Sequence, residues 1–280
     1  MPTRTPFDKL AKRMWSALLE RAGTVDTETE VAPDSQSIDL TFEPDAARLE
    51  SLRRFGLVGR MFHEEHALLE FFHDPPSSHD VLECLAKLTE RRKRPETRSS
   101  TLWILSAGRP TTAIAKLGFT AVPDWPSGTY ALEEDFFTRL IVINELPVER
   151  GTLLLRAVGA GRVLRDALSE ATALPPDAPE RAMIVPAVLK IWGEPNRDEE
   201  FAMATQDFVE RWERELLEKG QRAGREQAMR EVLTRQLRAR FGGLDDAVEA
   251  RIRAAGVDEL TRWTDRIITA AALDEVFAEP

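Results

Sequence analysis

Two carboxylates stand alone inside stretches of sequence that favour buried strands. Asp39 lies in "QSIDLTF", where apolar and polar residues alternate, and Glu70 interrupts the apolar run "ALLEFF". A buried carboxylate without a partner is costly, so each of the two needs a compensating contact. A hard divalent cation such as Mg²⁺ takes oxygen ligands of this kind and could polarise a scissile phosphate and activate water. The alternative is structural: Asp39 caps a turn and Glu70 pairs with an arginine.

Other charged residues could join these two carboxylates. Asp8 and Lys12 share one face of an expected N-terminal helix and could approach the site, although an ordinary surface pair is the simpler interpretation. Glu28 and Glu30 could add a ligand from a neighbouring strand, or they could line the solvated face of a hairpin.

A mixed α/β core is expected to position these residues. Helical spacing predicts a first helix over 7–23, with Gly23 as its C-terminal glycine, and a second helix over 44–62. A third helix is expected over 77–94, with Ser77 or Ser78 as its N-cap. Alternating and apolar runs predict five strands, at 24–31, 36–42, 67–72, 101–107 and 138–147. The order of these elements predicts an α/β domain over residues 1–150.

Beyond residue 150 the pattern is nearly all helical. We expect a helical extension of the core over 151–197, a long charged helix over 198–241 and a small helical module over 242–280, divided at Gly256. Arginines in the long helix are interleaved with glutamates, which is typical of a solvated or self-associating helix. This helix would act as a spacer or as the interface of a homodimer.

Composition narrows the class of protein. The 280 residues carry a net charge of −10, which argues against a generally basic nucleic-acid coat protein but not against a nuclease with local basic patches. The single cysteine, Cys84, excludes an internal disulfide and suits the reducing cytoplasm. The N-terminal stretch has no secretory signal and no apolar run is long enough to cross a bilayer, so we expect a cytoplasmic protein without a membrane partner.

The element order resembles that of the PD-(D/E)XK nuclease superfamily and, within it, the recombination-promoting nuclease and transposase family. Three stretches carry the resemblance: "FDKLAKRM" around Asp8 and Lys12, "SIDL" with Asp39, and "LLEFF" with Glu70. The stretch from "EKGQRAGR" onward looks like the uncharacterised helical domain that often follows these nuclease cores in bacteria. The resemblance implies a restriction-endonuclease-like mixed sheet, metal binding by Asp39 and Glu70, Mg²⁺ or Mn²⁺ as cofactor, and DNA as substrate, with a link to recombination or mobile elements.

One position departs from the superfamily pattern. Two residues after Glu70, where a lysine or glutamine is expected, the chain has Phe72. In the superfamily the lysine helps to orient water or to stabilise developing phosphate charge. Lys87, on the following helix, is the candidate replacement, because some members carry their lysine there. The alternative for Lys87 is a surface ion pair with Glu83, four residues earlier on the same helical face.

A basic stretch and a histidine cluster lie close to these residues in the sequence. Contacts to a DNA backbone could come from Arg91, Arg92, Lys93 and Arg94, although a solvated helix end explains them too. The four histidines fall at His63, His66, His73 and His79. "HEEH" lacks the spacing of a zinc-protease motif; a zinc site shared with His73 and a chance cluster both remain as interpretations.

We therefore expect a metal-dependent DNA endonuclease in which Asp39 and Glu70 hold the metal and Lys87 supplies positive charge. The first alternative is a degenerate nuclease that acts as a DNA- or protein-binding scaffold, and Phe72 favours it. The second alternative is a helical, self-associating interaction protein built around the long helix.

Overall fold

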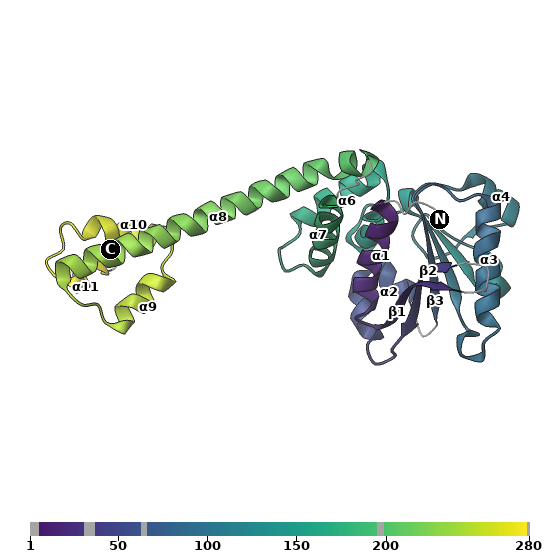
Figure 1. Ribbon diagram of the computed structural model, residues 1–280, viewed down its shortest axis with the longest axis horizontal. Helices are drawn as coiled ribbons and strands as arrows, with labels where there is room; N and C mark the ends of the chain where they lie inside the picture. The colour runs from purple at the N-terminus through teal and green to yellow at the C-terminus, as the bar shows by residue number, and fades with distance from the viewer. Residues whose placement is uncertain (1–5, 31–36, 63–65, 195–198, 279–280) are drawn as a thin grey trace. The chain divides into compact units, whose positions relative to one another are not determined.

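Seven strands of this protein form one sheet in the computed structural model, which describes residues 6–30, 37–62, 66–194 and 199–278 (Figure 1). The chain divides into two compact units, residues 1–209 and 210–280, and the division falls within the long helix α8. The strands are β1 (Gly23–Glu30), β2 (Ser37–Pro44), β3 (Ala67–Phe72), β4 (Thr101–Ser106), β5 (Thr120–Ala121), β6 (Thr129–Ala131) and β7 (Thr138–Val142).

Helices surround the sheet of the first unit and make up the second. Those of the first unit are α1 (Pro6–Leu19), α2 (Leu57–Met61), α3 (Ser78–Arg92), α4 (Thr111–Leu117), α5 (Leu153–Arg156), α6 (Gly161–Ala173) and α7 (Pro179–Trp192). The chain continues through α8 (Glu199–Phe241), α9 (Asp246–Ala254), α10 (Val257–Arg266) and α11 (Leu273–Val276). The predicted mixed α/β core followed by a helical region is confirmed.

The sheet is mixed, with the order β1-β2-β3-β4-β7-β6-β5. β1, β2 and β3 pair antiparallel, whereas β3, β4 and β7 run parallel. β3 therefore lies between an antiparallel and a parallel neighbour, and its first five residues are buried. A strand covered on both faces reads as a continuous apolar run, and this is why the one charged residue of "ALLEFF" is conspicuous.

Two layers of helices cover the sheet (Figure 1). α1 and α2 lie on one face, and α3 and α4 lie on the other. On the α3 face, Val81, Cys84 and Leu88 pack against Leu68 of β3 and Ile104 of β4.

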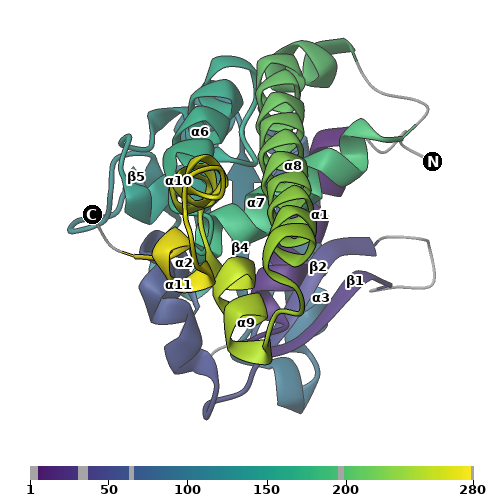
Figure 2. The same cartoon turned by 90° about the vertical axis from the view of Figure 1, so that its left-hand side faces the viewer.

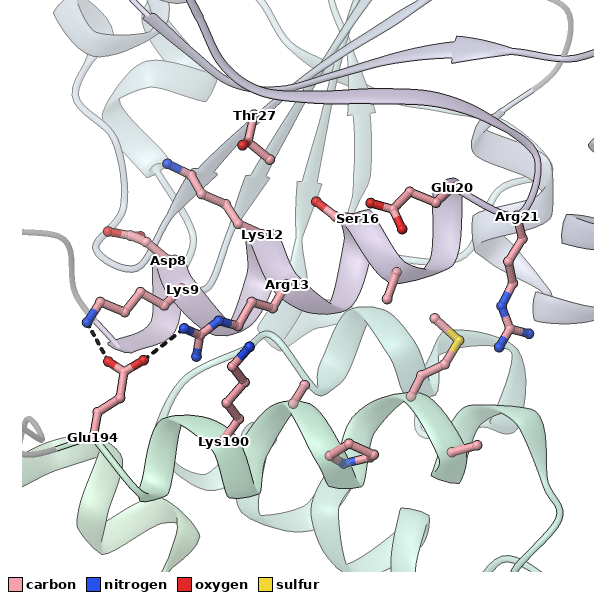
Figure 3. A pocket seen from close by; sticks show the side chains of 15 residues that line it. Asp8, Lys9, Lys12, Arg13, Ser16, Glu20, Arg21, Thr27, Lys190 and Glu194 are labelled. Atoms are coloured by element: carbon pink, nitrogen blue, oxygen red, sulfur yellow. Dashed lines mark hydrogen bonds and ion pairs between the residues drawn. The ribbon is translucent and has the colours of Figure 1, made fainter.

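The apolar face of α1 packs against the sheet through residues at helical spacing, which include Leu10, Met14, Trp15 and Leu18. Trp15 contacts Phe62 and Phe71 on this side of the sheet. The opposite side of α1 is polar and lies alongside α7 (Figure 3).

Local predictions differ from the structure at two glycines. Gly23 does not end the first helix, which stops at Leu19, but begins β1. A side chain at Gly23 would place its Cβ 2.0 Å from the carbonyl oxygen of Glu43 on β2, so close strand pairing explains the glycine. The single helix expected over 44–62 is instead a 3₁₀ helix, η1 (Leu49–Phe55), and the short α2, because Gly56 between them has a φ of 58°.

The second unit has its own small core. Leu233 and Leu237 of α8 pack with Ile252, Leu260 and Trp263 from the helices that follow. These helices lie beside the C-terminal part of α8 (Figure 2). The expected division at Gly256 is confirmed, since this residue separates α9 from α10. In the described part of the chain, no helix combines the length and the apolar character needed to cross a membrane.

Candidate functional site

Asp39 and Glu70 come together where β2 and β3 meet. Leu40 of β2 lies opposite Leu69 of β3, and continuing this antiparallel register by one residue places Asp39 opposite Glu70. Backbone pairing between β2 and β3 ends at Leu40 and Leu69. Beyond this point the backbone N–H of Phe71 donates to a side chain, Asp39 Oδ2, at 3.0 Å. The two carboxylates are close enough for the charge of Asp39 to raise the pKa of Glu70.

Lys87 of α3 supplies the first cation. Its Nζ lies 2.8 Å from Glu70 Oε1, and the Glu70 side chain is only 6 % exposed. Ser77 caps α3: its side chain accepts from the N–H of Asp80, and the Asp80 carboxylate accepts from the N–H of Ser77. This cap and the buried apolar face of α3 fix the helix on the sheet and direct Lys87 at Glu70.

Lys12 of α1 supplies the second cation, from the opposite face of the sheet. Its Nζ lies 2.7 Å from Asp39 Oδ1, and the Lys12 side chain is 16 % exposed. Lys12, an accessory candidate expected to form a surface pair with Asp8, contacts Asp39. The site therefore consists of two carboxylates in contact, each paired with a different lysine.

The electrostatics of Glu70 reflect its burial. Desolvation, followed by the charge of Asp39, raises the pKa of Glu70 to about 7, against the opposing effect of Lys87. Burial alone would lower the pKa of Lys87, but the charge of Glu70 and its hydrogen bond outweigh burial and raise that pKa. Glu70 therefore exchanges a proton near neutral pH, while Lys87 stays charged.

The two carboxylates suit a hard cation that keeps most of its water. Among the described residues, no group of three or more His, Cys, Asp or Glu side chains gathers as a ligand set. Mg²⁺ is nevertheless bound in many phosphoryl-transfer sites by one or two carboxylates, with water and substrate phosphates completing the shell. Two carboxylates held in contact, one of them buried, repel each other, and a divalent cation would relieve that repulsion.

Of the remaining acidic candidates, Glu83 has a partner outside this site. Glu83 is exposed and pairs with His79 at 3.4 Å, so the alternative pair between Glu83 and Lys87 is not formed. Asp8 lies on α1 near Lys12 and lines a groove on the polar side of that helix. Glu30 is the last residue of β1, and its side chain lies outside the described part of the structure.

The basic stretch at the end of α3 is largely engaged in local contacts. Arg91 approaches Glu43 at 4.0 Å, and Lys93 pairs with Glu90. Arg92 donates to the carbonyl of Ser100 and lies over the ring of Phe137. Arg94 precedes a short 3₁₀ helix, η2 (Pro95–Thr97). These contacts give the stretch a structural role that the sequence pattern does not reveal.

The described histidines do not share a site. His66 lies 3.7 Å from Glu43, and His79 pairs with Glu83. His73 stacks on Phe7 with ring centroids 3.8 Å apart, and its Nε2 lies 3.2 Å from Glu200. His63 lies outside the described residues.

Phe72, two residues after Glu70, is partly buried and packs against the core on the α3 face. Alternation along β3 places Phe72 on the same face as Glu70, where the cation is Lys87.

Comparisons of this chain with protein-family models, with curated proteins and with solved structures find no match.

Proposed function

We propose that this protein is a metal-dependent DNA endonuclease of the PD-(D/E)XK type that hydrolyses phosphodiester bonds. One observation carries the proposal: Lys87 Nζ lies 2.8 Å from the buried carboxylate of Glu70, which itself contacts Asp39. Two neighbouring carboxylates can hold a metal ion that activates water, and a lysine beside them can stabilise charge on a phosphate, which together suit phosphodiester hydrolysis.

Each side chain has a role in this proposal. Asp39 and Glu70 would hold Mg²⁺ or Mn²⁺, and the ion would supply polarisation of the scissile phosphate and a lowered pKa of water. Lys87 stabilises the negative charge that grows on the phosphate, in place of the lysine that Phe72 replaces. Lys12 positions Asp39 through the contact at 2.7 Å, and the N–H of Phe71 fixes the other carboxylate oxygen.

Cleavage of supercoiled plasmid DNA with Mg²⁺ or Mn²⁺ tests the proposal. We expect wild type to nick the plasmid and Asp39→Asn and Glu70→Gln each to abolish nicking, because each removes a charged metal ligand. Glu96→Gln makes the same chemical change at an exposed position of η2 and should leave the rate unchanged. A wild type that binds DNA but does not cut it with either metal would contradict the proposal.

Such a result would favour a second function, a nuclease fold that binds DNA without cutting it. The observation behind this alternative is Phe72, since the apolar side chain stands where the superfamily carries a catalytic cation. The two functions differ in their dependence on metal. A binding protein would keep its affinity in EDTA and would show the same affinity with Asp39→Asn.

A further inference from the structure

A groove of about 700 Å³ runs between α1 and α7 on the polar side of α1 (Figure 3). Thr27 of β1 also lines it. The basic side chains that line it are Lys9, Lys12, Arg13, Arg21 and Lys190, and the acidic ones are Asp8, Glu20 and Glu194. Basic residues therefore outnumber acidic ones in the groove, although the chain as a whole has a net charge of −10. The positive charge is a local feature of the groove.

Glu194 lies across two of these cations. Its Oε2 is 2.5 Å from Lys9 Nζ and its Oε1 is 2.9 Å from Arg13 Nη2 (Figure 3). One anionic group thus gives a separate oxygen to each of two cations, as the non-bridging oxygens of a phosphate diester do. The hydrogen bond from Lys9 holds the pKa of Glu194 below its usual value, so this carboxylate stays charged at neutral pH.

The cations of the groove keep capacity for a ligand. Arg13 Nη1 is buried and has no hydrogen-bond partner among the described residues. A buried donor without a partner is unfavourable, and an additional acceptor in the groove would satisfy it. Lys190 projects toward Arg13 from α7 (Figure 3), and within the described part of the chain it has no ion pair.

The groove leads to the candidate site. Lys9, Lys12 and Arg13 follow one another at helical spacing on α1, so they present one continuous basic face. Lys12 belongs both to the lining of the groove and to the site, where its Nζ contacts Asp39. A strand held along this face would therefore reach Lys12, whose Nζ contacts the carboxylate of Asp39 on β2.

We propose that the groove between α1 and α7 binds phosphate groups of a DNA backbone, and that Glu194 occupies one phosphate position when DNA is absent. The identification of DNA as the ligand rests on the proposed function. The inference that Glu194 occupies an anion site formed by Lys9 and Arg13 rests on the geometry of the groove alone. DNA must displace Glu194 from Lys9 and Arg13, so this carboxylate weakens DNA binding.

Binding of a fluorescent DNA duplex in EDTA, measured at several salt concentrations, tests this without requiring cleavage. We expect Lys9→Ala, Arg13→Ala and Lys190→Ala each to weaken binding and to reduce the slope of log affinity against log salt by about 0.9. Glu194→Gln should strengthen binding severalfold, because it removes the competing charge. Arg165→Ala, at an exposed position of α6 outside the groove, should change neither quantity.

Several outcomes separate the two proposals. The groove proposal would be overturned, even if the protein cuts DNA, by either of two results. One is that Lys9→Ala, Arg13→Ala and Lys190→Ala leave DNA affinity and its salt dependence as unchanged as Arg165→Ala does; the other is that Glu194→Gln binds DNA no more tightly than wild type. Groove-dependent binding without any cleavage would instead uphold the groove and contradict the nuclease. Lys190→Ala breaks no described ion pair, so a loss of affinity in this variant cannot be ascribed to a lost ion pair between α1 and α7.

Discussion

Replacing Glu70 by glutamine should make the first unit more stable at alkaline pH. Folding raises the pKa of Glu70 from 4.5 to about 7, because burial and Asp39 disfavour the charged form. Between these values the folded chain keeps a proton that the unfolded chain has lost, so stability falls as pH rises. At about 1.4 kcal/mol for each pKa unit, the ionised carboxylate costs about 3 kcal/mol above pH 7.

Glutamine mimics the protonated carboxyl group and avoids this cost. Glu70→Gln and wild type should therefore unfold at similar denaturant concentrations near pH 5, and the variant should gain up to about 3 kcal/mol near pH 9. Lys87 keeps a hydrogen-bond acceptor in the variant, since the glutamine carbonyl can replace Glu70 Oε1. Glu96→Gln, at an exposed position, should change stability by less than about 0.5 kcal/mol at either pH.

Cys84 provides the assay. It is the only cysteine in the chain, it is 2 % exposed, and it packs on the α3 face beside Leu88. Its reaction with a dithiodipyridine reagent in increasing urea therefore reports opening of the first unit alone. The rate for the fully unfolded chain at each pH corrects for the reactivity of the thiol. A variant that is no more stable than wild type near pH 9 would refute the reasoning, because it would mean that Lys87 compensates the buried charge completely.

Three further predictions concern other parts of the structure. Lys87→Met removes the cation beside Glu70, so plasmid cleavage should fall by roughly 10²–10³-fold. Because Lys87 lowers the pKa of Glu70, the decrease in stability with rising pH should extend to higher pH in this variant than in wild type. Gly56→Ala and Gly161→Ala both force a side chain into a positive φ, at a cost of about 1–2 kcal/mol; only at Gly56 would the new Cβ also meet another backbone segment, at 2.4 Å, so urea unfolding should show a clearly larger loss there. Leu237→Ala should cost the second unit about 2–5 kcal/mol by hydrogen exchange, whereas Leu217→Ala, 63 % exposed, should cost less than about 0.5 kcal/mol.

The strands that carry the carboxylates were predictable because their signal is local. Alternation around Asp39 and the apolar run around Glu70 match β2 and β3, and Ser77 begins α3 as its N-cap. Adjacent strands bring the two acids together without long-range information. Lys87 could be proposed for the same reason, since only 17 residues separate it from Glu70.

The groove was not predictable, because its parts are distant in sequence. Lys9 and Glu194 are 185 residues apart, and no pattern in the sequence links the two positions. Lys12 could be proposed near the site, but its contact with Asp39 depends on how α1 crosses the sheet, which hydrophobic spacing does not specify. The small strands β5 and β6, with two and three residues, are too short for a periodic pattern.

The order of the strands also bears on how the protein emerges from the ribosome. β1, β2, β3 and β4 are neighbours in the sheet in the order of their synthesis, so the two carboxylates can meet early. Of the two helices that line the groove, α7 is synthesised long after α1. Until it arrives, Lys9 and Arg13 lack the carboxylate of Glu194, and the nascent chain presents its basic face uncovered. A growing chain would then hold polyanions, including the nucleic acid that surrounds it, more tightly than the finished protein does.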